Sequence, residues 1–278
     1  MHNGFTGGRP ASDSLKEYAR GIVGGLIFSF PMLYTMEVWW AGFIAGPFHF
    51  VALVPVTFFL LLGYNRYAGM RPGSSWRSIF VDSIEEMGIG LVLSFFLLFL
   101  LKRIEFQGMG LEEIMGKVVI EAMFASIGVS VGTAQLGSDS GNEEKENRKG
   151  MQAMLSLALC GAILVGGNVA PTEEIVMLAM EARPVEMLAM VLCSLLLSSV
   201  VVYFSDFRGS AREAPRDMAF FVTLDACLSY LVALLSSAFV LWFFGRFESV
   251  SFEVAFAQCV VLGFIASLGA SAGRLLIK

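Results

Sequence analysis

Acidic residues follow helix-breaking residues in two long apolar stretches of this sequence. The residues concerned are Pro31 and Glu37 in the first stretch, and Gly166, Gly167, Asn168, Pro171, Glu173 and Glu174 in the second. Proline removes a backbone donor and paired glycines loosen a helix, so each stretch is predicted to break there. Exposed carbonyls at a break and the carboxylates that follow could together coordinate a cation, as discontinuous helices do in transporters. We therefore predict ion binding at these breaks, with Glu37 and Glu174 as metal ligands.

Other acidic residues lie within or beside apolar stretches. A charged side chain at the centre of a bilayer costs about 2.5–3.5 kcal/mol on insertion scales, so such groups usually face a cavity, a partner or a proton path. Asp225 and Glu121 join the predicted ion-binding set for this reason. Asp82, Glu85 and Glu86 are interpreted instead as solvated residues at the inner end of a span. For the glutamates after the breaks, the simpler alternative is a proline kink that leaves them at the outer interface.

Serine and glycine alternate in two matching stretches. The first contains Ser126, Gly128, Ser130 and Gly132, and the second, 141 positions later, contains Ser267, Gly269, Ser271 and Gly273. Small residues at this spacing let helix backbones approach closely, so a packing seam is the favoured interpretation. If the stretches face each other, their hydroxyls and carbonyls could instead line a narrow passage between two acidic layers.

Membrane-spanning helices must position these residues. Hydrophobic residues make up 56% of the chain and charged residues 15%, and the mean hydropathy is +0.71, which excludes an ordinary soluble domain. A helix needs about 20 apolar residues to cross the hydrocarbon core. We therefore predict an all-α polytopic membrane protein. Its eight spans are expected near residues 20–43, 48–65, 82–101, 117–136, 152–182, 185–204, 218–244 and 252–273.

The positive charges predict the orientation of these spans. If the N-terminus is cytoplasmic, fourteen of the 19 lysines and arginines fall in the N-terminal, C-terminal and other cytoplasmic segments. Cytoplasmic loops carry an excess of such residues, so both termini are expected in the cytoplasm. The predicted location is the bacterial inner membrane.

The two halves of the chain resemble each other. Besides the serine and glycine stretches, Asp82 and Arg103 recur 143 positions later as Asp225 and Arg246. We predict two four-helix membrane repeats, at 1–136 and 151–278, joined by a charged cytoplasmic linker at 137–150. Four spans per copy return the second copy in the same orientation, which predicts a pseudo-two-fold axis along the membrane normal.

Several function classes are excluded by composition and motifs. The net charge of −5 gives no basic surface for nucleic acid. The four cysteines lie in apolar stretches without C-x-x-C spacing, and no catalytic triad, H-E-x-x-H motif or P-loop is present. We expect no enzymatic activity and no cofactor. The expected partners are the lipid bilayer and a small inorganic cation or proton, and a homo-oligomer could form.

The whole chain resembles a family of bacterial integral membrane proteins of unknown function, through F-P-M-L-Y-T-M-E at 30–37 and G-G-N-V-A-P-T-E-E at 166–174. The second motif is also similar to signature stretches of the cation/calcium exchanger superfamily, and this resemblance implies Asn168, Glu173 and Glu174 as cation ligands. The first motif departs from that pattern because neither Asn nor Ser precedes Pro31. The exchangers also have inverted repeats, whereas the charges here predict parallel ones.

Taken together, the sequence predicts a membrane transporter for a cation, with a coupled proton movement through the buried carboxylates. The alternatives are a passive cation channel that uses the same acids and a membrane scaffold or sensor that transports nothing.

Overall fold

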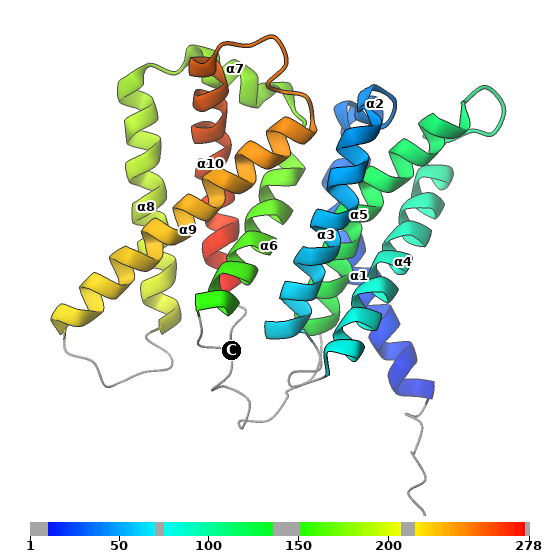
Figure 1. Cartoon of the computed structure of the whole chain (residues 1–278), viewed down its shortest axis with the longest axis horizontal. Coiled ribbons are helices and arrows are strands. Elements are labelled where there is room, and N and C mark those ends of the chain that lie inside the picture. Colours follow the sequence, from blue (N-terminus) through cyan, green and yellow to red (C-terminus); the bar gives the residue numbers. More distant parts are fainter. Residues whose placement is uncertain (1–10, 70–74, 136–150, 207–214, 276–278) are drawn as a thin grey trace, which may run out of the picture.

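The computed structural model describes residues 11–69, 75–135, 151–206 and 215–275, and every regular element in these ranges is an α-helix. The expected linker at 137–150 lies outside the described residues. The helices, shown in Figure 1, are α1 (Ala11–Leu33), α2 (Met36–Ile44), α3 (Pro47–Tyr67), α4 (Trp76–Leu100), α5 (Leu111–Gln135), α6 (Met151–Val169), α7 (Glu173–Glu181), α8 (Pro184–Asp206), α9 (Pro215–Phe243) and α10 (Phe252–Leu275).

Seven of these helices are long and apolar enough to cross a membrane, namely α3, α4, α5, α6, α8, α9 and α10. An eighth crossing results if α1 and α2 are counted as one span. A helix satisfies its backbone hydrogen bonds internally, which is what a chain in lipid requires. The structure thus confirms an all-helical protein with seven or eight candidate membrane spans.

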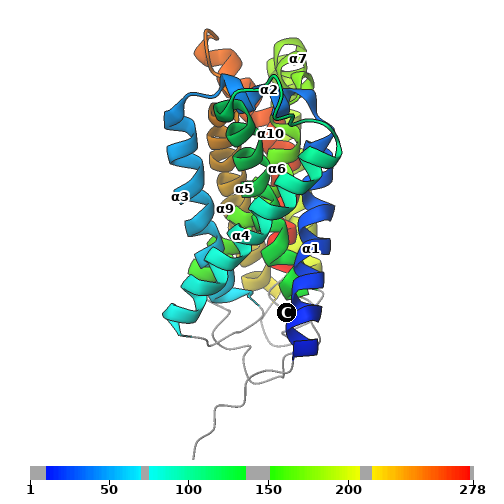
Figure 2. The same ribbon diagram turned by 90° about the vertical axis from the view of Figure 1, so that its right-hand side faces the viewer.

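The long helices run between two ends of one bundle. The described part of α1 begins, and that of α10 finishes, at the end that we call the terminal end (Figure 1). The short helices α2 and α7 lie at the opposite end, which we call the capped end (Figure 1). In Figure 2 the long helices α1 and α3 lie on either side of α5, which packs against both.

The first and fifth predicted spans are broken, as expected, but near the capped end of the bundle and not midway along it. The chain bends by 86° between α1 and α2. At this break the Thr35 hydroxyl donates to the Pro31 carbonyl over 2.7 Å. At the break between α6 and α7, the Thr172 hydroxyl donates to the Val169 carbonyl over 2.8 Å. These hydroxyls satisfy carbonyls that a terminating helix leaves without an intrahelical donor.

The breaks do not fall on all of the predicted residues. Pro31 lies inside α1, which continues to Leu33. Gly166 and Gly167 lie inside α6, where the Ala170 amide still donates to the Gly166 carbonyl over 2.8 Å. A Cβ atom on Gly167 would lie 2.1 Å from the ring of Phe124, so this glycine allows a close helix contact and does not interrupt the helix. Pro171 is the predicted residue that lies in the break itself.

The serine and glycine stretches form contacts with helices of their own halves. A Cβ on Gly24 of α1 would lie 2.4 Å from the Gly132 Cα of α5. A Cβ on Gly161 of α6 would lie 2.1 Å from the Gly269 carbonyl oxygen of α10. Such distances leave no room for any side chain, so the stretches serve as backbone-to-backbone packing seams.

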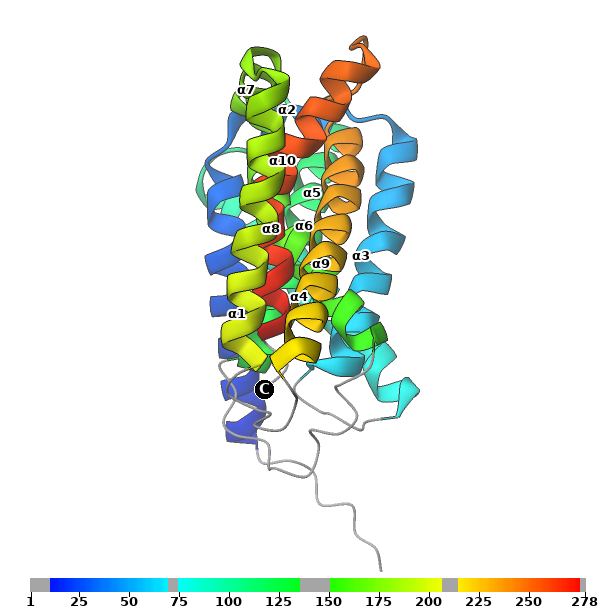
Figure 3. The ribbon, with the colours of Figure 1, turned by 90° about the vertical axis from the view of Figure 1, so that its left-hand side faces the viewer.

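Both halves have the same order of elements and the same principal packing partners. The first half packs α1, α2, α3 and α4 around α5, and the second packs α6, α7, α8 and α9 around α10. Figure 3 shows α10 between α8 and α9. Helices α3, α5 and α6 make the main contacts between the halves, and buried residues of α3, α5, α6, α9 and α10 form the largest apolar cluster there. The pseudo-two-fold axis remains a prediction.

Candidate functional site

A cavity at the terminal end of the first half is lined by acidic side chains. It has a volume of about 40 Å³, and its carboxyl groups come from Glu17 of α1 and from Asp82, Glu85 and Glu86 of α4. Asn65, near the end of α3, also lines it. Among the described residues that line this cavity, none is basic. A concave surface lined by one sign of charge concentrates ions of the opposite sign, so this cavity favours cations.

Glu86 is the buried member of this acidic group and is held by a polar network. Only 8% of its surface is exposed. Asn65 donates through Nδ2 to Glu86 Oε2 over 2.7 Å and to Ser83 Oγ over 3.1 Å. The Ser130 hydroxyl donates to Asn65 Oδ1 over 2.9 Å, which fixes the orientation of the amide. Three helices, α3, α4 and α5, therefore position one carboxyl group at the inner limit of the cavity.

The expectation that Glu86 is a solvated interfacial residue is wrong. The sequence predicts that this span begins near residue 82, whereas α4 begins at Trp76, after the N-cap Ser75. Because the helix begins six residues earlier than predicted, Glu86 lies about 9 Å further from the helix start along the axis, at 1.5 Å per residue. The preceding carboxyls, Asp82 and Glu85, are half-buried and line the cavity.

A second, larger cavity lies at the capped end. It has a volume of about 170 Å³ and is lined by residues of α2, α3, α7 and the segment after α9. Its ionisable lining residues are Glu37, His49, Glu173, Arg246 and Glu248. The breaks therefore bring Glu37 of the first half to the same cavity as a glutamate of the second half.

The capped-end cavity contains a different glutamate of the second half from the one that the sequence pairs with Glu37. Glu173, and not Glu174, is among the lining residues of the capped-end cavity. Successive residues of a helix point in directions about 100° apart, so only one of two adjacent glutamates can face the cavity. Among the described residues, no three His, Cys, Asp or Glu side chains come together as a metal-binding group. Glu37 and Glu174 are thus not part of such a cluster.

An arginine side chain contacts the region of each helix break. Arg246, in the segment after α9, donates through Nη2 to the Pro171 carbonyl between α6 and α7. In the first half, the guanidinium of Arg103 lies 4.3 Å from the ring centre of Trp39. The indole of Trp39 in turn donates to the Leu33 carbonyl over 3.1 Å, at the end of α1. Sequence reasoning treated both arginines as loop charges and as matching positions of the two halves, and predicted no contact with the breaks.

Apolar residues of α3, α5, α6 and α9, which we call the apolar barrier, lie between the levels of the two acidic cavities along α3. They surround a small space of about 10 Å³, and among the described residues that line it Thr57 is the only one with a polar side chain. The buried rings of Phe124 and Phe243 belong to this lining, and Phe243 also lines the capped-end cavity. A space of this size holds about one water molecule.

The three spaces follow one another along α3. His49 lies near the start of this helix in the capped-end cavity, Thr57 lies in the barrier, and Asn65 lies in the terminal-end cavity. These positions are 8 residues apart, or about 12 Å of helix each. The sequence predicted two acidic layers with small residues between them, but large apolar residues separate the layers.

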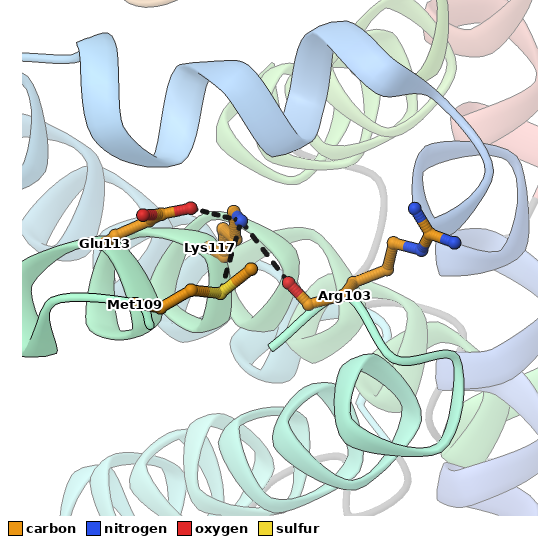
Figure 4. A network of polar contacts seen from close by, with 4 residues as sticks. All are labelled: Arg103, Met109, Glu113 and Lys117. Atoms are coloured by element: carbon orange, nitrogen blue, oxygen red, sulfur yellow. Dashed lines mark hydrogen bonds and ion pairs between the residues drawn. The ribbon is translucent and has the colours of Figure 1, made fainter. Parts of the chain in front are cut away.

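Two further charged side chains are buried in α5. Lys117 donates to Glu113 over 2.5 Å, to the Arg103 carbonyl over 3.3 Å and to the Met109 sulfur over 3.8 Å, as Figure 4 shows. Glu121 exposes 0% of its surface, and neither carboxyl oxygen has a hydrogen-bond partner among the described residues. Among the residues whose side chains the structure describes, every buried charged residue belongs to the first half.

The remaining predicted ligands lie apart from these cavities. Asn168 donates through Nδ2 to the Leu164 carbonyl one turn earlier in α6 over 2.6 Å, and it lines none of the three cavities. Asp225 is half-buried on α9 and lines none of them either. Glu174 is exposed on α7.

Sequence reasoning missed the polar residues that depend on contacts between helices. Asn65 gave one usable signal, because it is an amide in the last part of an otherwise apolar span. Its pairing with Glu86 and Ser130 could not be predicted, since these residues are 21 and 65 positions away in the chain.

Comparison with known proteins identifies a family but no activity. No curated protein and no solved structure matches the chain. The model of the family described as "Putative integral membrane protein (DUF2391)" matches residues 17–277, which is nearly the whole chain. Together with seven or eight candidate membrane spans, this match shows that the chain belongs to this family of integral membrane proteins of unknown function.

Proposed function

We propose that this membrane protein transports a small cation across the bacterial inner membrane in exchange for protons, with Glu86 as the carboxyl group that holds each ion in turn. The observation that carries the proposal is the position of Glu86. It lies buried in a candidate span, at the inner limit of an acidic cavity, with its side chain held by Asn65. A carboxyl group in this environment is costly to keep unless ions reach it.

The orientation follows from the charges of the sequence. Fourteen of the 19 lysines and arginines fall on the side of the two termini, and this bias supports a cytoplasmic terminal end. The cavity with Glu86 then opens to the cytoplasm. The capped-end cavity, with Glu37 and Glu173, faces the opposite side of the membrane.

The apolar barrier favours a transporter over an open channel. A channel needs a continuous polar or hydrated passage, whereas large apolar side chains here line the space between the levels of the two cavities along α3. A cation bound at Glu86 would cross only after the packing of Leu60, Phe124 and Phe243 changes. Such a change, with access first from one end and then from the other, is the general mechanism of secondary transporters.

The ligands around Glu86 favour a monovalent cation. Divalent Ca²⁺ takes six to eight oxygen ligands, often several carboxylates, and Mg²⁺ demands near-ideal octahedral geometry. Among the described residues that line the cavity, Glu86 is the one acid that is buried. Its partner is the Asn65 amide, which in turn bonds to the hydroxyls of Ser83 and Ser130. One negative charge balances one proton or one monovalent cation, so a one-for-one exchange fits this site.

Flux measurements in proteoliposomes test this proposal. Purified protein would be reconstituted, and Na⁺, K⁺, Mg²⁺ and Ca²⁺ uptake would be followed separately. We expect uptake of a monovalent cation by the unmodified protein and a loss of at least about 100-fold in Glu86→Gln, since the neutral amide cannot balance the ion's charge.

The matched control is Glu112→Gln, which removes one carboxylate from an exposed position of α5 outside all three cavities. This variant should retain the uptake of the unmodified protein. Uptake that is absent from the unmodified protein, or equal in Glu86→Gln, would overturn the proposal and leave the scaffold or sensor alternative.

A further inference from the structure

Glu121 is a buried carboxyl group that the proposed ion path does not use. It lies in α5, exposes 0% of its surface and has no hydrogen-bond partner among the described residues. An ionised carboxylate in such a place lacks any compensation for the loss of hydration, so the arrangement suits the neutral, protonated form. A group of this kind can accept a charge partner only if the surrounding side chains rearrange.

Lys117 is the charged side chain closest to Glu121 along α5. Glu113, Lys117 and Glu121 follow one another at intervals of four residues, which places them on one face of the helix, about 6 Å apart along the axis. Lys117 now pairs with Glu113, on the side of the capped end, over 2.5 Å. The same lysine has a second carboxyl group one turn away on the other side.

The other helices that pack on α5 bring no equivalent charge to Glu121. Helix α6 has no charged residue between Met151 and Val169. Glu37 of α2 lines the capped-end cavity, and the acids of α4 line the terminal-end cavity. The Lys, Arg, His and Glu residues of α1 and α3 with described side chains are Lys16, Glu17 and Arg20, in the terminal-end half of α1, and His49 and Arg66, near the two ends of α3.

The position of Lys117 is directly linked to α2. A Cβ on Gly42 of α2 would lie 2.6 Å from the Lys117 Cγ and 2.8 Å from the Lys117 backbone nitrogen, so this helix packs on both the side chain and the backbone of the lysine. The ring centre of Phe43, the next residue of α2, lies 5.9 Å from Lys117 Nζ. The same short helix supplies Glu37, Trp40 and Ile44 to the wall of the capped-end cavity. A movement of Lys117 therefore displaces the wall of that cavity.

We propose that Glu121 is a proton-binding site, and that Lys117 moves from Glu113 to Glu121 when Glu121 releases its proton. The O–H bond of the Glu121 carboxyl group breaks, and its proton passes to a water molecule at the capped end, which becomes hydronium. The lysine keeps its own proton throughout, and Glu113 remains as a carboxylate. Lys117 thereby exchanges Glu113 for Glu121 as its ion-pair partner, and helix α2 moves with the lysine side chain. This inference deepens the proposed exchange of protons for cations, on which its physiological meaning rests, by adding a proton site that controls access to the capped-end cavity.

The second half lacks the residues for this exchange. At the offset of 141 that aligns the serine and glycine stretches, Lys117 corresponds to Gln258 and Glu121 corresponds to Leu262. Gln258 is fully buried, like Lys117, but carries no charge. The proposed device is therefore confined to α2 and α5, and Gln258 offers a matched control position.

Distances between spin labels on the full chain test the inference. The four native cysteines would be replaced by serine, and labels would be attached at Met36→Cys on α2 and Phe252→Cys at the start of α10, which are both exposed positions. In liposomes without an ion gradient, we expect the distance to change by about 2 Å between acidic and alkaline buffer, a typical helix shift in switching proteins.

Variants assign the shift to the two residues. Glu121→Gln and Lys117→Gln should each abolish the dependence on pH, whereas Glu121→Asp, which keeps a carboxyl group, should restore it. The control Gln258→Leu and the transport variant Glu86→Gln should both keep the shift. An unchanged shift in Glu121→Gln, or no shift in the unmodified sequence background, would overturn the inference. This experiment measures no transport, so its outcome does not depend on whether the protein transports a cation. An absent distance change would likewise leave the flux measurements of the proposed function unaffected.

Discussion

Glu86 illustrates how a single residue acquires its role from contacts that the sequence does not display. Its neighbours Asp82 and Glu85 suggest a solvated helix end. Helix α4 begins earlier than predicted, at Trp76, and this changes that interpretation. The amide of Asn65 then makes the carboxyl group part of a network between three helices. Predicting this would require knowledge of which faces of α3, α4 and α5 meet.

Replacement of Asn65 tests the importance of this network. In Asn65→Leu, Glu86 and Ser130 lose their shared partner, and we expect cation uptake to fall by at least about 10-fold, because one lost buried hydrogen bond to a charged group is worth about 1.5–3 kcal/mol. Ser83→Ala is the comparison variant, because Asn65 loses one acceptor there but keeps its bonds to Glu86 and Ser130. Uptake in proteoliposomes measures both. Equal uptake in Asn65→Leu and Ser83→Ala would contradict a positioning role for Asn65.

At the scale of the helices, the sequence predicted the positions of helix breaks and of helix packing contacts, and the break positions were predicted less accurately. The Pro-Thr-Glu-Glu motif at 171–174 correctly indicated a new helix after a break. Pro31 did not mark the position of the first break. Helix α1 continues past it to Leu33, the chain then bends by 86° before Met36, and the Thr35 hydroxyl bonds to the Pro31 carbonyl at this bend. The glycine pair at 166–167 serves contact with Phe124. Glycine alone does not distinguish a break from a close contact.

The packing seams predict large effects of very small substitutions. Gly161→Ala would place a Cβ 2.1 Å from the Gly269 carbonyl oxygen, so α6 and α10 must separate. We expect a loss of about 1–3 kcal/mol of stability, as for other overpacked sites. Gly88→Ala on α4, with no atom within 4 Å of its Cβ, should instead gain about 0.5–1 kcal/mol.

Thermal unfolding of the purified variants in detergent compares these two substitutions. A lower unfolding temperature for Gly161→Ala and an equal or higher one for Gly88→Ala are expected. Equal stability of both variants would show that α6 and α10 are not in backbone contact in solution.

For the whole molecule, composition and hydropathy were sufficient to predict a helical membrane protein, and six of the eight expected spans correspond closely to single helices. The relation between the halves was less accessible. Equal element order suggests equal roles, yet the buried charges of the described residues, Glu86, Lys117 and Glu121, all lie in the first half. Pairing Glu37 with Glu174 assumed a symmetric site. The terminal-end cavity with Glu86 is instead lined, among the described residues, by the first half alone. The second half contributes residues of α6 and α9 to the apolar barrier.

The central claim is that one buried carboxyl group, Glu86, holds a cation and a proton in turn on a path that the apolar barrier closes between steps. Simultaneous recording of cation and proton movement in proteoliposomes tests this claim most directly. An imposed gradient of the transported cation should drive protons in the opposite direction and against their own gradient, in the unmodified protein and in Glu112→Gln. Glu86→Gln should show neither movement. Cation flux without any opposing proton movement, or uphill proton movement that persists in Glu86→Gln, would contradict the account.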